Sequence, residues 1–128
     1  IRPARRDKFH FKMEVEVYPA DIVFSFGETD DELKRVLKRY KIEYNEHYIP
    51  MKGEGQYQMF YNGRYSLIRM DRYPNSPRDY ATLAHEIFHA ATHIMERLGL
   101  QLKIDFSDEG YAYLIGHITR GVYEKIIT

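Results

Sequence analysis

The sequence predicts one α+β domain in which a small, mostly antiparallel sheet packs on about three helices. Three observations lead to this class. Apolar and polar residues alternate early in the chain, which is the period of half-buried strands. Asn62-Gly63 separates strand-like runs at residues 56–61 and 64–70, and this dipeptide predicts a hairpin turn. Two apolar stripes at helical spacing follow, and 128 residues is an ordinary length for a single domain over residues 1–128.

The earlier elements follow one another along the chain. Residues 9–17 alternate apolar and polar positions, and a turn then leads into a more buried run at residues 22–26. Thr29 and Glu32 have the spacing of a capping box, so we expect a helix that starts there and ends near Tyr40. A less regular stretch separates this helix from the predicted hairpin.

Two long helices are predicted after the hairpin. Ser76 is an N-cap residue, Pro77 suits the first helical position, and Gly99 supplies a left-handed residue after the helix end. No further Pro and no Gly interrupts the sequence between these ends. The second helix starts at a cap formed by Ser107 or Asp108 and runs to near the C-terminus.

The first of these helices contains His85-Glu86-Ile87-Phe88-His89. Two histidines four residues apart lie on one helix face, about one turn apart, where both can bind the same metal ion. Glu86 is placed to act on a water molecule at that ion. Zinc accepts nitrogen and carboxylate ligands and keeps one position open in catalytic sites, so the sequence predicts a Zn²⁺ site. The alternative is two surface histidines and an ion-pairing glutamate.

We expect a third ligand from the second helix, so that the site lies between the two helices. Glu109 falls in its first turn, and Gly110 beside it lets two helices approach closely. The alternative for Glu109 is a carboxylate that complements the helix dipole. His93 extends the histidine line by a further turn, about 6 Å along the axis. One tetrahedral ion does not easily reach all three histidines, so we interpret His93 as a partner of the ligands or a structural residue.

The motif His-Glu-x-x-His, nineteen intervening residues and then Glu resembles that of the gluzincin metallopeptidases. The run Asp108-Glu109-Gly110-Tyr111-Ala112 is similar to the one around the third ligand in aminopeptidase-N-like members. The resemblance covers about residues 75–125 and implies a minimal zincin-like domain. The roles it implies are zinc ligation by His85, His89 and Glu109, with Glu86 as general base. The whole chain is also similar to small His-Glu-x-x-His proteins encoded by tailed bacteriophages.

Two departures from the family pattern matter. In thermolysin-like members an Asp one turn after the third ligand orients a ligand histidine, whereas Tyr113 stands at that position here. Asp108 or a backbone carbonyl is expected to take over that role. Nineteen residues follow Glu109, too few for the C-terminal subdomain of larger members, so we expect a local donor to stabilise the transition state. The candidates are Tyr113 and His117; the equal alternatives are an aromatic core residue and a surface histidine.

The strand that precedes the metal helix is a candidate for binding a protein or peptide substrate. In the resembled peptidases an edge strand pairs with the extended substrate backbone, and residues 64–70 come just before the helix. We therefore expect Arg64, Ser66 and Ile68 to contact substrate. The alternative is that this strand is paired on both edges. The tyrosines of this region suit a contact surface and, equally, half-buried strands.

Composition limits the other classes of function. The formal net charge is zero, so there is no overall attraction to nucleic acid or to an anionic membrane. Residues 2–12 are basic, but we interpret residues 1–8 as a solvated, flexible arm rather than a nucleic-acid contact. No run reaches membrane-spanning length, no secretory signal is visible and no cysteine is present. We expect a cytoplasmic protein, in the bacterial host if the chain is phage-encoded.

Two functions remain. The first is a zinc metallopeptidase, and the second is a non-catalytic zinc-binding structural or interaction protein that uses the same site to hold two helices together. Glu86 favours the first, because a structural site needs no base at that position. Structural zinc sites are also commonly rich in cysteine, and this chain has none.

Overall fold

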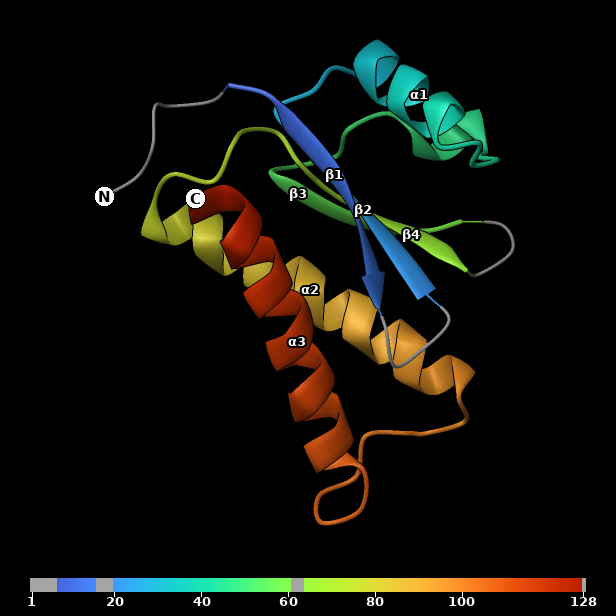
Figure 1. Cartoon of the computed structure of the whole chain (residues 1–128), viewed down its shortest axis with the longest axis vertical. Helices are drawn as coiled ribbons and strands as arrows, with labels where there is room; N and C mark the ends of the chain where they lie inside the picture. The colour runs from blue at the N-terminus through green and yellow to red at the C-terminus, as the bar shows by residue number, and fades with distance from the viewer. Residues whose placement is uncertain (1–6, 16–19, 61–63, 128) are drawn as a thin grey trace.

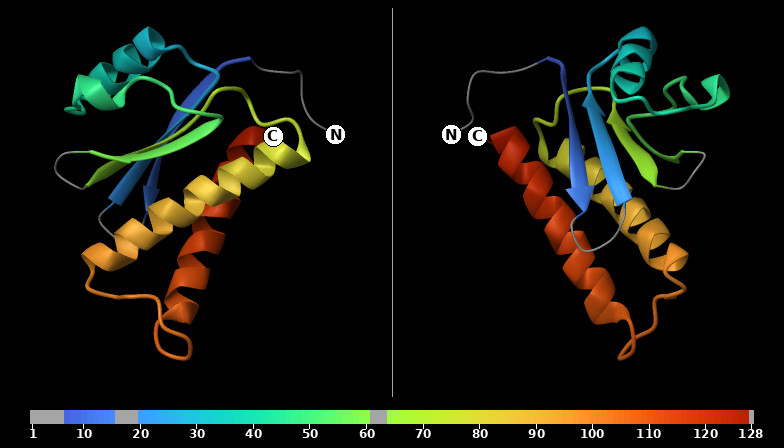
Figure 2. Two further views of the ribbon diagram at one scale, coloured as in Figure 1. Left: turned by 180° about the vertical axis from the view of Figure 1, so that it is seen from behind. Right: turned by 45° about the vertical axis from the view of Figure 1, so that its right-hand side comes forward.

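The computed structural model describes residues 7–15, 20–60 and 64–127 (Figure 1). A four-stranded sheet is covered by one α-helix on one face and by two on the other (Figure 2). Each face of the sheet has its own cluster of buried apolar side chains. The α+β class and the expected three helices are confirmed.

The strands are β1 (Phe9–Val15), β2 (Ala20–Phe26), β3 (Gly55–Met59) and β4 (Tyr65–Met70). Their order across the sheet is β1-β2-β4-β3. The pairs β1–β2 and β3–β4 are antiparallel, whereas β2 and β4 are parallel. The predicted hairpin is therefore present, although its turn at Asn62-Gly63 lies outside the described residues. The end of the first predicted strand, residues 16–17, lies outside them as well.

Helix α1 (Asp30–Arg39) covers one face of the sheet. Its N-terminus has the predicted capping box: the Thr29 hydroxyl accepts a hydrogen bond from the Glu32 N–H at 3.1 Å, and the Glu32 carboxylate accepts one from the Thr29 N–H at 2.9 Å. Its apolar side packs on the sheet in a cluster that includes Val23, Leu33, Val36, Leu37 and Leu67. A short 3-10 helix, η1 (Glu46–Tyr48), follows before β3.

Helices α2 (Pro77–Arg97) and α3 (Asp108–Ile127) cover the other face and run in roughly opposite directions (Figure 2). The Ser76 hydroxyl accepts a hydrogen bond from the Asp79 N–H at 3.1 Å, and Gly99 has φ 79°, so both predicted ends of α2 are confirmed. The start of α2 lies beside the end of α3, because the rings of Tyr80 and Tyr123 have centroids 5.6 Å apart.

The loop between α2 and α3 holds the first turn of α3 next to the last turns of α2. The Tyr111 hydroxyl donates a hydrogen bond to the Leu100 carbonyl at 2.6 Å. A β-carbon added at Gly110 would lie 3.1 Å from the terminal methyl of Met95. The loop itself leaves its large apolar side chains exposed; they are Leu98, Leu100, Leu102, Ile104 and Phe106.

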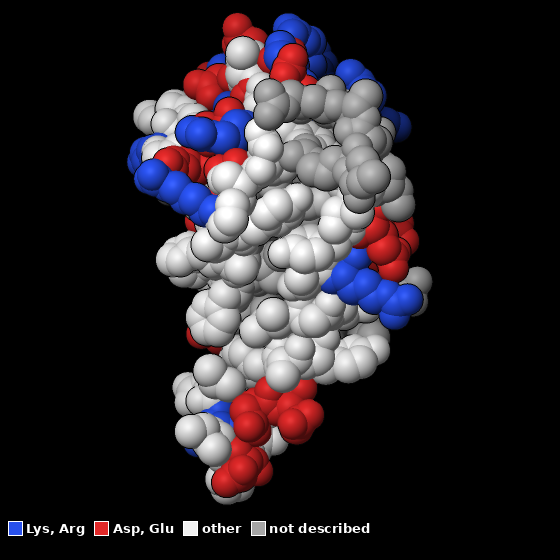
Figure 3. Space-filling view, turned by 90° about the vertical axis from the view of Figure 1, so that its left-hand side faces the viewer, with Lys and Arg blue, Asp and Glu red and all other residues white. Residues whose placement is uncertain are grey.

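The surface seen in Figure 3 carries groups of both signs at its upper end and a largely uncharged middle. Acidic side chains gather near its lower end, where Figure 1 places the α2–α3 loop. No helix in the described part of the chain combines the length and the apolar character that crossing a bilayer requires.

Candidate metal centre

His85, Glu86 and His89 form a group on α2 whose candidate ligand atoms all lie within 4.8 Å of one another. The Nε2 atoms of the two histidines are 3.1 Å apart, and their rings are inclined at 78°. Both histidines are exposed, whereas Glu86 is only 7% exposed. Among the described residues this is the one group of three or more potential ligands that can hold a metal ion. The motif thus forms the cluster that its helical spacing predicts.

The two imidazoles fit a single ion. Two nitrogen ligands of a tetrahedral zinc ion, each bound at about 2.0–2.1 Å, lie roughly 3.3 Å apart. The 3.1 Å between the Nε2 atoms of His85 and His89 is close to that value. The same separation also suits a hydrogen bond between two neutral rings. Imidazole nitrogens with a nearby carboxylate suit zinc as well as other divalent first-row metals.

The Glu86 side chain lies beside β3 as well as near the two histidines. A β-carbon added at Gly55 would lie 3.2 Å from Glu86 Oε2 and 2.5 Å from the Thr82 side-chain methyl. Burial raises the pKa of the Glu86 carboxyl, and the neighbouring His85 and His89 partly offset that rise. Glu86 therefore lies at the boundary between the exposed histidines and the strand, where its carboxyl is partly shielded from water.

Tyr57 on β3 contacts two histidines of α2. Its ring centroid lies 6.2 Å from that of His89, with 29° between the planes, and 4.9 Å from that of His93. The Tyr57 hydroxyl and His93 Nδ1 are hydrogen bonded at 3.1 Å. Burial raises the pKa of Tyr57 to about 12, against the opposing effects of a hydrogen bond from Ser66 and the charge of Arg97. His93 does not belong to the metal-capable group, which consists of His85, Glu86 and His89. This is compatible with its interpretation as a structural residue or as a partner of the ligands.

Glu109 is exposed on the first turn of α3 and is not a member of the group. That turn is held beside Met95, which is six residues beyond His89 and so about 9 Å further along the helix axis. Within the described residues, Asp108 makes no hydrogen bond to His85 or His89. Ligation by Glu109 and support by Asp108 stay predictions, and both require the first turn of α3 to lie nearer to the histidines.

Tyr113 and His117 stack on one another, with ring centroids 6.3 Å apart and 10° between the planes. Tyr113 is 61% exposed on α3. His117 lines a pocket with residues of β1 and α3, namely Met13, Glu14, Arg120, Gly121 and Glu124. Since β1 and β3 are at opposite ends of the strand order, the structure does not bring these two residues together with Glu86. Their proposed role as donors stays a prediction.

The prediction that residues 64–70 offer an open strand edge is wrong. β4 pairs with β2 on one side and with β3 on the other, and both Ser66 and Ile68 are buried. Arg64 precedes the strand and forms an ion pair with Asp21 at 3.9 Å. The alternative, pairing on both edges, is the observed arrangement. A substrate strand cannot add to β4, because its backbone groups are already used within the sheet.

In the described sheet, β3 is an edge strand, and it packs beside α2. The Phe60 N–H donates a hydrogen bond to the Tyr65 carbonyl of β4, and the Glu54 carbonyl accepts one from the N–H of Asp71, just after β4. Backbone groups alternate in direction along an antiparallel pair, so the N–H and carbonyl groups of Tyr57 and Met59 point away from β4. An extended backbone can add to the sheet at these two residues.

The sequence alone does not single out Gly55 or Tyr57 as residues of the site. Side chains two residues apart in a strand lie on the same face of the sheet, so the sequence does indicate that Gly55 and Tyr57 share a face. Which face of which strand meets α2 depends on the order of the strands, and that order is set by long-range pairing.

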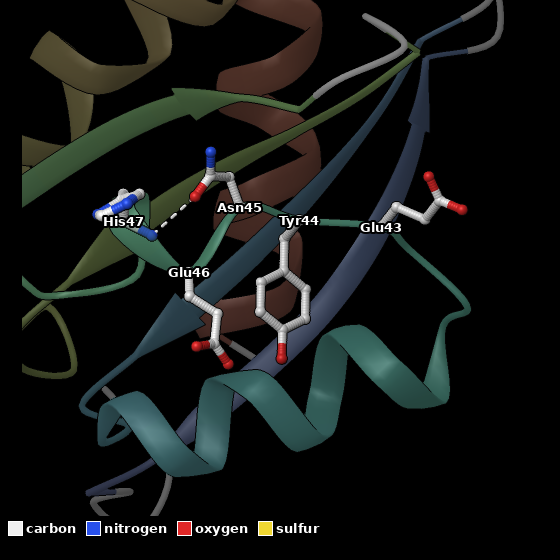
Figure 4. Close-up of a pocket in the computed structure, with 5 residues that line it drawn as sticks. All are labelled: Glu43, Tyr44, Asn45, Glu46 and His47. Atoms are coloured by element: carbon white, nitrogen blue, oxygen red, sulfur yellow. Dashed lines mark hydrogen bonds between the residues drawn. The ribbon is translucent and has the colours of Figure 1, made fainter.

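A separate hollow lies around η1, with a volume of about 520 Å³ (Figure 4). Its lining residues are Glu43, Tyr44, Asn45, Glu46 and His47. The Asn45 side chain accepts a hydrogen bond from the His47 N–H at 2.9 Å, and Tyr44 packs on the apolar cluster beneath α1. The hollow therefore belongs to the α1 side of the sheet, and its carboxylates and imidazole form no metal-capable group among the described residues.

Comparisons of the chain with protein-family models, with curated proteins and with solved structures found no match. The candidate centre is therefore defined by its own geometry. Two imidazoles and one carboxylate on α2 can hold a metal ion, and β3 supplies the wall beside them.

Proposed function

We propose that this chain is a zinc-dependent metallopeptidase in which His85 and His89 bind the metal and Glu86 is the general base. The observation that carries the proposal is the 3.1 Å separation of the two Nε2 atoms, with the Glu86 carboxylate in the same group. Peptide hydrolysis needs a carboxylate near the metal-binding nitrogens, whereas a purely structural zinc site has no use for a base.

Zinc bound here would supply a water molecule of lowered pKa and would polarise the carbonyl group of the substrate. Glu86 accepts the proton of the attacking water at a carboxylate oxygen and passes it to the leaving amine nitrogen. The close approach of Gly55 supports this role, because it leaves the Glu86 side chain room beside β3 while limiting its freedom there. A base of fixed position transfers protons more effectively than a mobile one.

The substrate in this proposal is a protein or peptide segment in an extended conformation. It pairs with the outer edge of β3 through the backbone groups of Tyr57 and Met59, the mode known as strand addition. The support is position: Gly55 and Tyr57 of the same strand contact Glu86 and His89, so a peptide on β3 runs past the metal-capable group.

Glu109 is the third ligand in this proposal, on the basis of its spacing from His89. Its approach requires a movement of the first turn of α3, whose link to α2 is the loop of residues 98–107. The exposure of that loop's apolar side chains supports such a movement, because the loop itself has few packing contacts to lose. The hydrogen bond from the buried Tyr111 to the Leu100 carbonyl is the contact that the movement has to break or carry with it.

A metal-binding protein without turnover is the second candidate. The observation that favours it is that all three members of the group come from α2, while Glu109 remains outside. A site of two histidines on one helix binds metal without the ligand geometry of a complete peptidase centre. Both candidates predict metal binding, and they differ in the consequence of removing the Glu86 carboxylate.

Elemental analysis and a cleavage assay on the same preparations test the proposal. We expect about one zinc ion per chain in the wild type and in a His47→Ala control, and little in His89→Ala. The wild type should cleave a quenched fluorescent peptide mixture, whereas Glu86→Gln should keep its zinc and lose cleavage. Equal cleavage by Glu86→Gln contradicts the role of the base. Zinc without any cleavage by the wild type supports the second candidate, and absence of zinc after its addition overturns both.

A further inference from the structure

We propose that Tyr57 and His93 act as a pair that holds the imidazole of His89 in its metal-binding orientation. Both are positioning residues in this proposal, because they act through His89 and not on the metal or the substrate. The inference rests on the metal site of the proposed function, and it assigns to that site two residues outside the His-Glu-x-x-His motif.

The contacts form a chain from one residue to the next. The Tyr57 ring lies nearly parallel to that of His89, with 29° between the planes and 6.2 Å between centroids. The Tyr57 hydroxyl is hydrogen bonded to His93 Nδ1 at 3.1 Å, and the two rings meet edge to face at 4.9 Å. Tyr57 thus touches the candidate ligand with its ring and is itself held by the histidine one turn further along α2.

The position of Tyr57 is fixed by the sheet. Tyr57 is paired with Ile68 of β4, a fully buried residue. Two residues earlier, Gly55 brings the same strand against Glu86 and Thr82 of α2. The position of the Tyr57 ring is therefore fixed, by the interior strand β4 on one side and by α2 on the other.

His89 needs a neighbouring group that fixes its orientation, because its own side chain is exposed. An exposed imidazole occupies several rotamers, and binding a metal then costs the free energy of selecting one of them. Ligand histidines are usually oriented by a neighbouring group, and loss of that group typically weakens metal binding about 10- to 100-fold. In the described part of the chain no carboxylate or backbone carbonyl accepts a hydrogen bond from the His89 ring, whose hydrogen-bond partner is His85. We infer that the face of the Tyr57 ring orients His89 instead.

A competing role for His93 is that of a third histidine ligand. Its Nδ1 atom is already engaged by the Tyr57 hydroxyl, and its side chain is not within the 4.8 Å group. The two roles respond differently to substitution. His93→Asn places an amide near the position of Nδ1 and can keep the hydrogen bond to Tyr57. His93→Leu fills similar space and cannot form that bond.

The experiment measures metal binding, not catalysis. Metal-free protein is titrated with Co²⁺, followed by its visible absorption, and with Zn²⁺ in competition with a chelator. We expect Tyr57→Phe and His93→Leu each to weaken binding about 10-fold and to change the Co²⁺ spectrum. The double variant should bind no more weakly than either single one, because the two residues act as one unit. His93→Asn should bind like the wild type, as should the control Tyr123→Phe, a half-buried tyrosine that packs on α2 away from the site.

Three outcomes overturn the inference. Wild-type affinity and spectrum in Tyr57→Phe and His93→Leu would show that the pair does not position His89. Binding by His93→Asn as weak as that by His93→Leu would identify His93 as a ligand. Failure of the wild type to bind either metal would remove the proposed function as well, whereas the first two results leave that function standing.

Discussion

Gly55 and Thr82 meet across the interface of β3 and α2 at a distance that only glycine allows, and the Glu86 carboxylate lies beside them. A β-carbon at position 55 would lie 3.2 Å from Glu86 Oε2 and 2.5 Å from the Thr82 methyl. Thr82 is β-branched and sits in a helix, so its side chain has little freedom to move aside. The approach of β3 to the candidate metal centre therefore depends on the absence of a side chain at this residue.

Gly55→Ala should displace β3 from α2. Overpacking of this kind typically costs about 1–3 kcal/mol of unfolding free energy. Gly116→Ala on α3 is the matched control, since a β-carbon there meets nothing within 4 Å. Alanine in place of glycine inside a helix should raise the unfolding free energy by about 0.5–1 kcal/mol. Urea unfolding of both variants checks this, and equal stability of the two would refute the close contact.

Met59→Pro tests whether a peptide pairs with β3. The Met59 N–H points away from β4, so its removal leaves the sheet intact, and proline is tolerated on edge strands. Loss of one hydrogen bond to the substrate is worth about 1 kcal/mol, which should raise KM roughly fivefold. Met59→Ala keeps the amide and serves as control. The strand-addition hypothesis fails if the proline and alanine variants have the same KM.

Glu109→Gln tests the third ligand. If the first turn of α3 reaches the metal, loss of this carboxylate should weaken Zn²⁺ binding by on the order of 100-fold or more. Glu96→Gln removes an exposed carboxylate of α2 and should change nothing. Metal affinity is the measurement to use, because a first-turn carboxylate also stabilises its helix through the dipole. Equal Zn²⁺ affinity in the two variants would mean that α2 alone forms the site.

Glu32→Gln should remove a stabilising contribution that depends on pH. The hydrogen bond from Lys8, followed by that from the Thr29 N–H, lowers the pKa of Glu32 from 4.5 to about 2. Because the folded-state pKa lies below the unfolded one, the carboxylate stabilises the fold above about pH 4.5, and this contribution is lost as pH falls towards 2. Denaturant unfolding at several pH values should show the difference between wild type and variant shrinking over that range.

A Glu43→Gln control removes an exposed carboxylate outside any helix and should leave the pH dependence of unfolding as in the wild type. A wild-type advantage over Glu32→Gln that is as large at pH 2.5 as at pH 7 would contradict the low pKa of Glu32. It would then point to packing of the side chain as its contribution to stability.

Local spacing predicted much of the fold and the centre of the candidate site. The capping box at Thr29, the ends of α2 at Ser76 and Gly99, and the juxtaposition of His85 with His89 are interactions within four residues of the chain or at a helix end. Such interactions depend on backbone geometry that neighbouring residues already impose. They could be read before any long-range contact was known.

Only the tertiary structure decided which strand lies at the edge, and the prediction for residues 64–70 was wrong for that reason. Strand order follows from pairing between distant segments: β4 inserts between β2 and β3, and this leaves β3 beside α2. The same pairing brought Gly55 and Tyr57 to Glu86 and His89, and the loop after α2 set where Glu109 lies. By itself the sequence determined the pair of histidines, because a spacing of four residues in a helix suffices to align them. The residues that surround this pair were decided by contacts that form only when the sheet and the helices pack together.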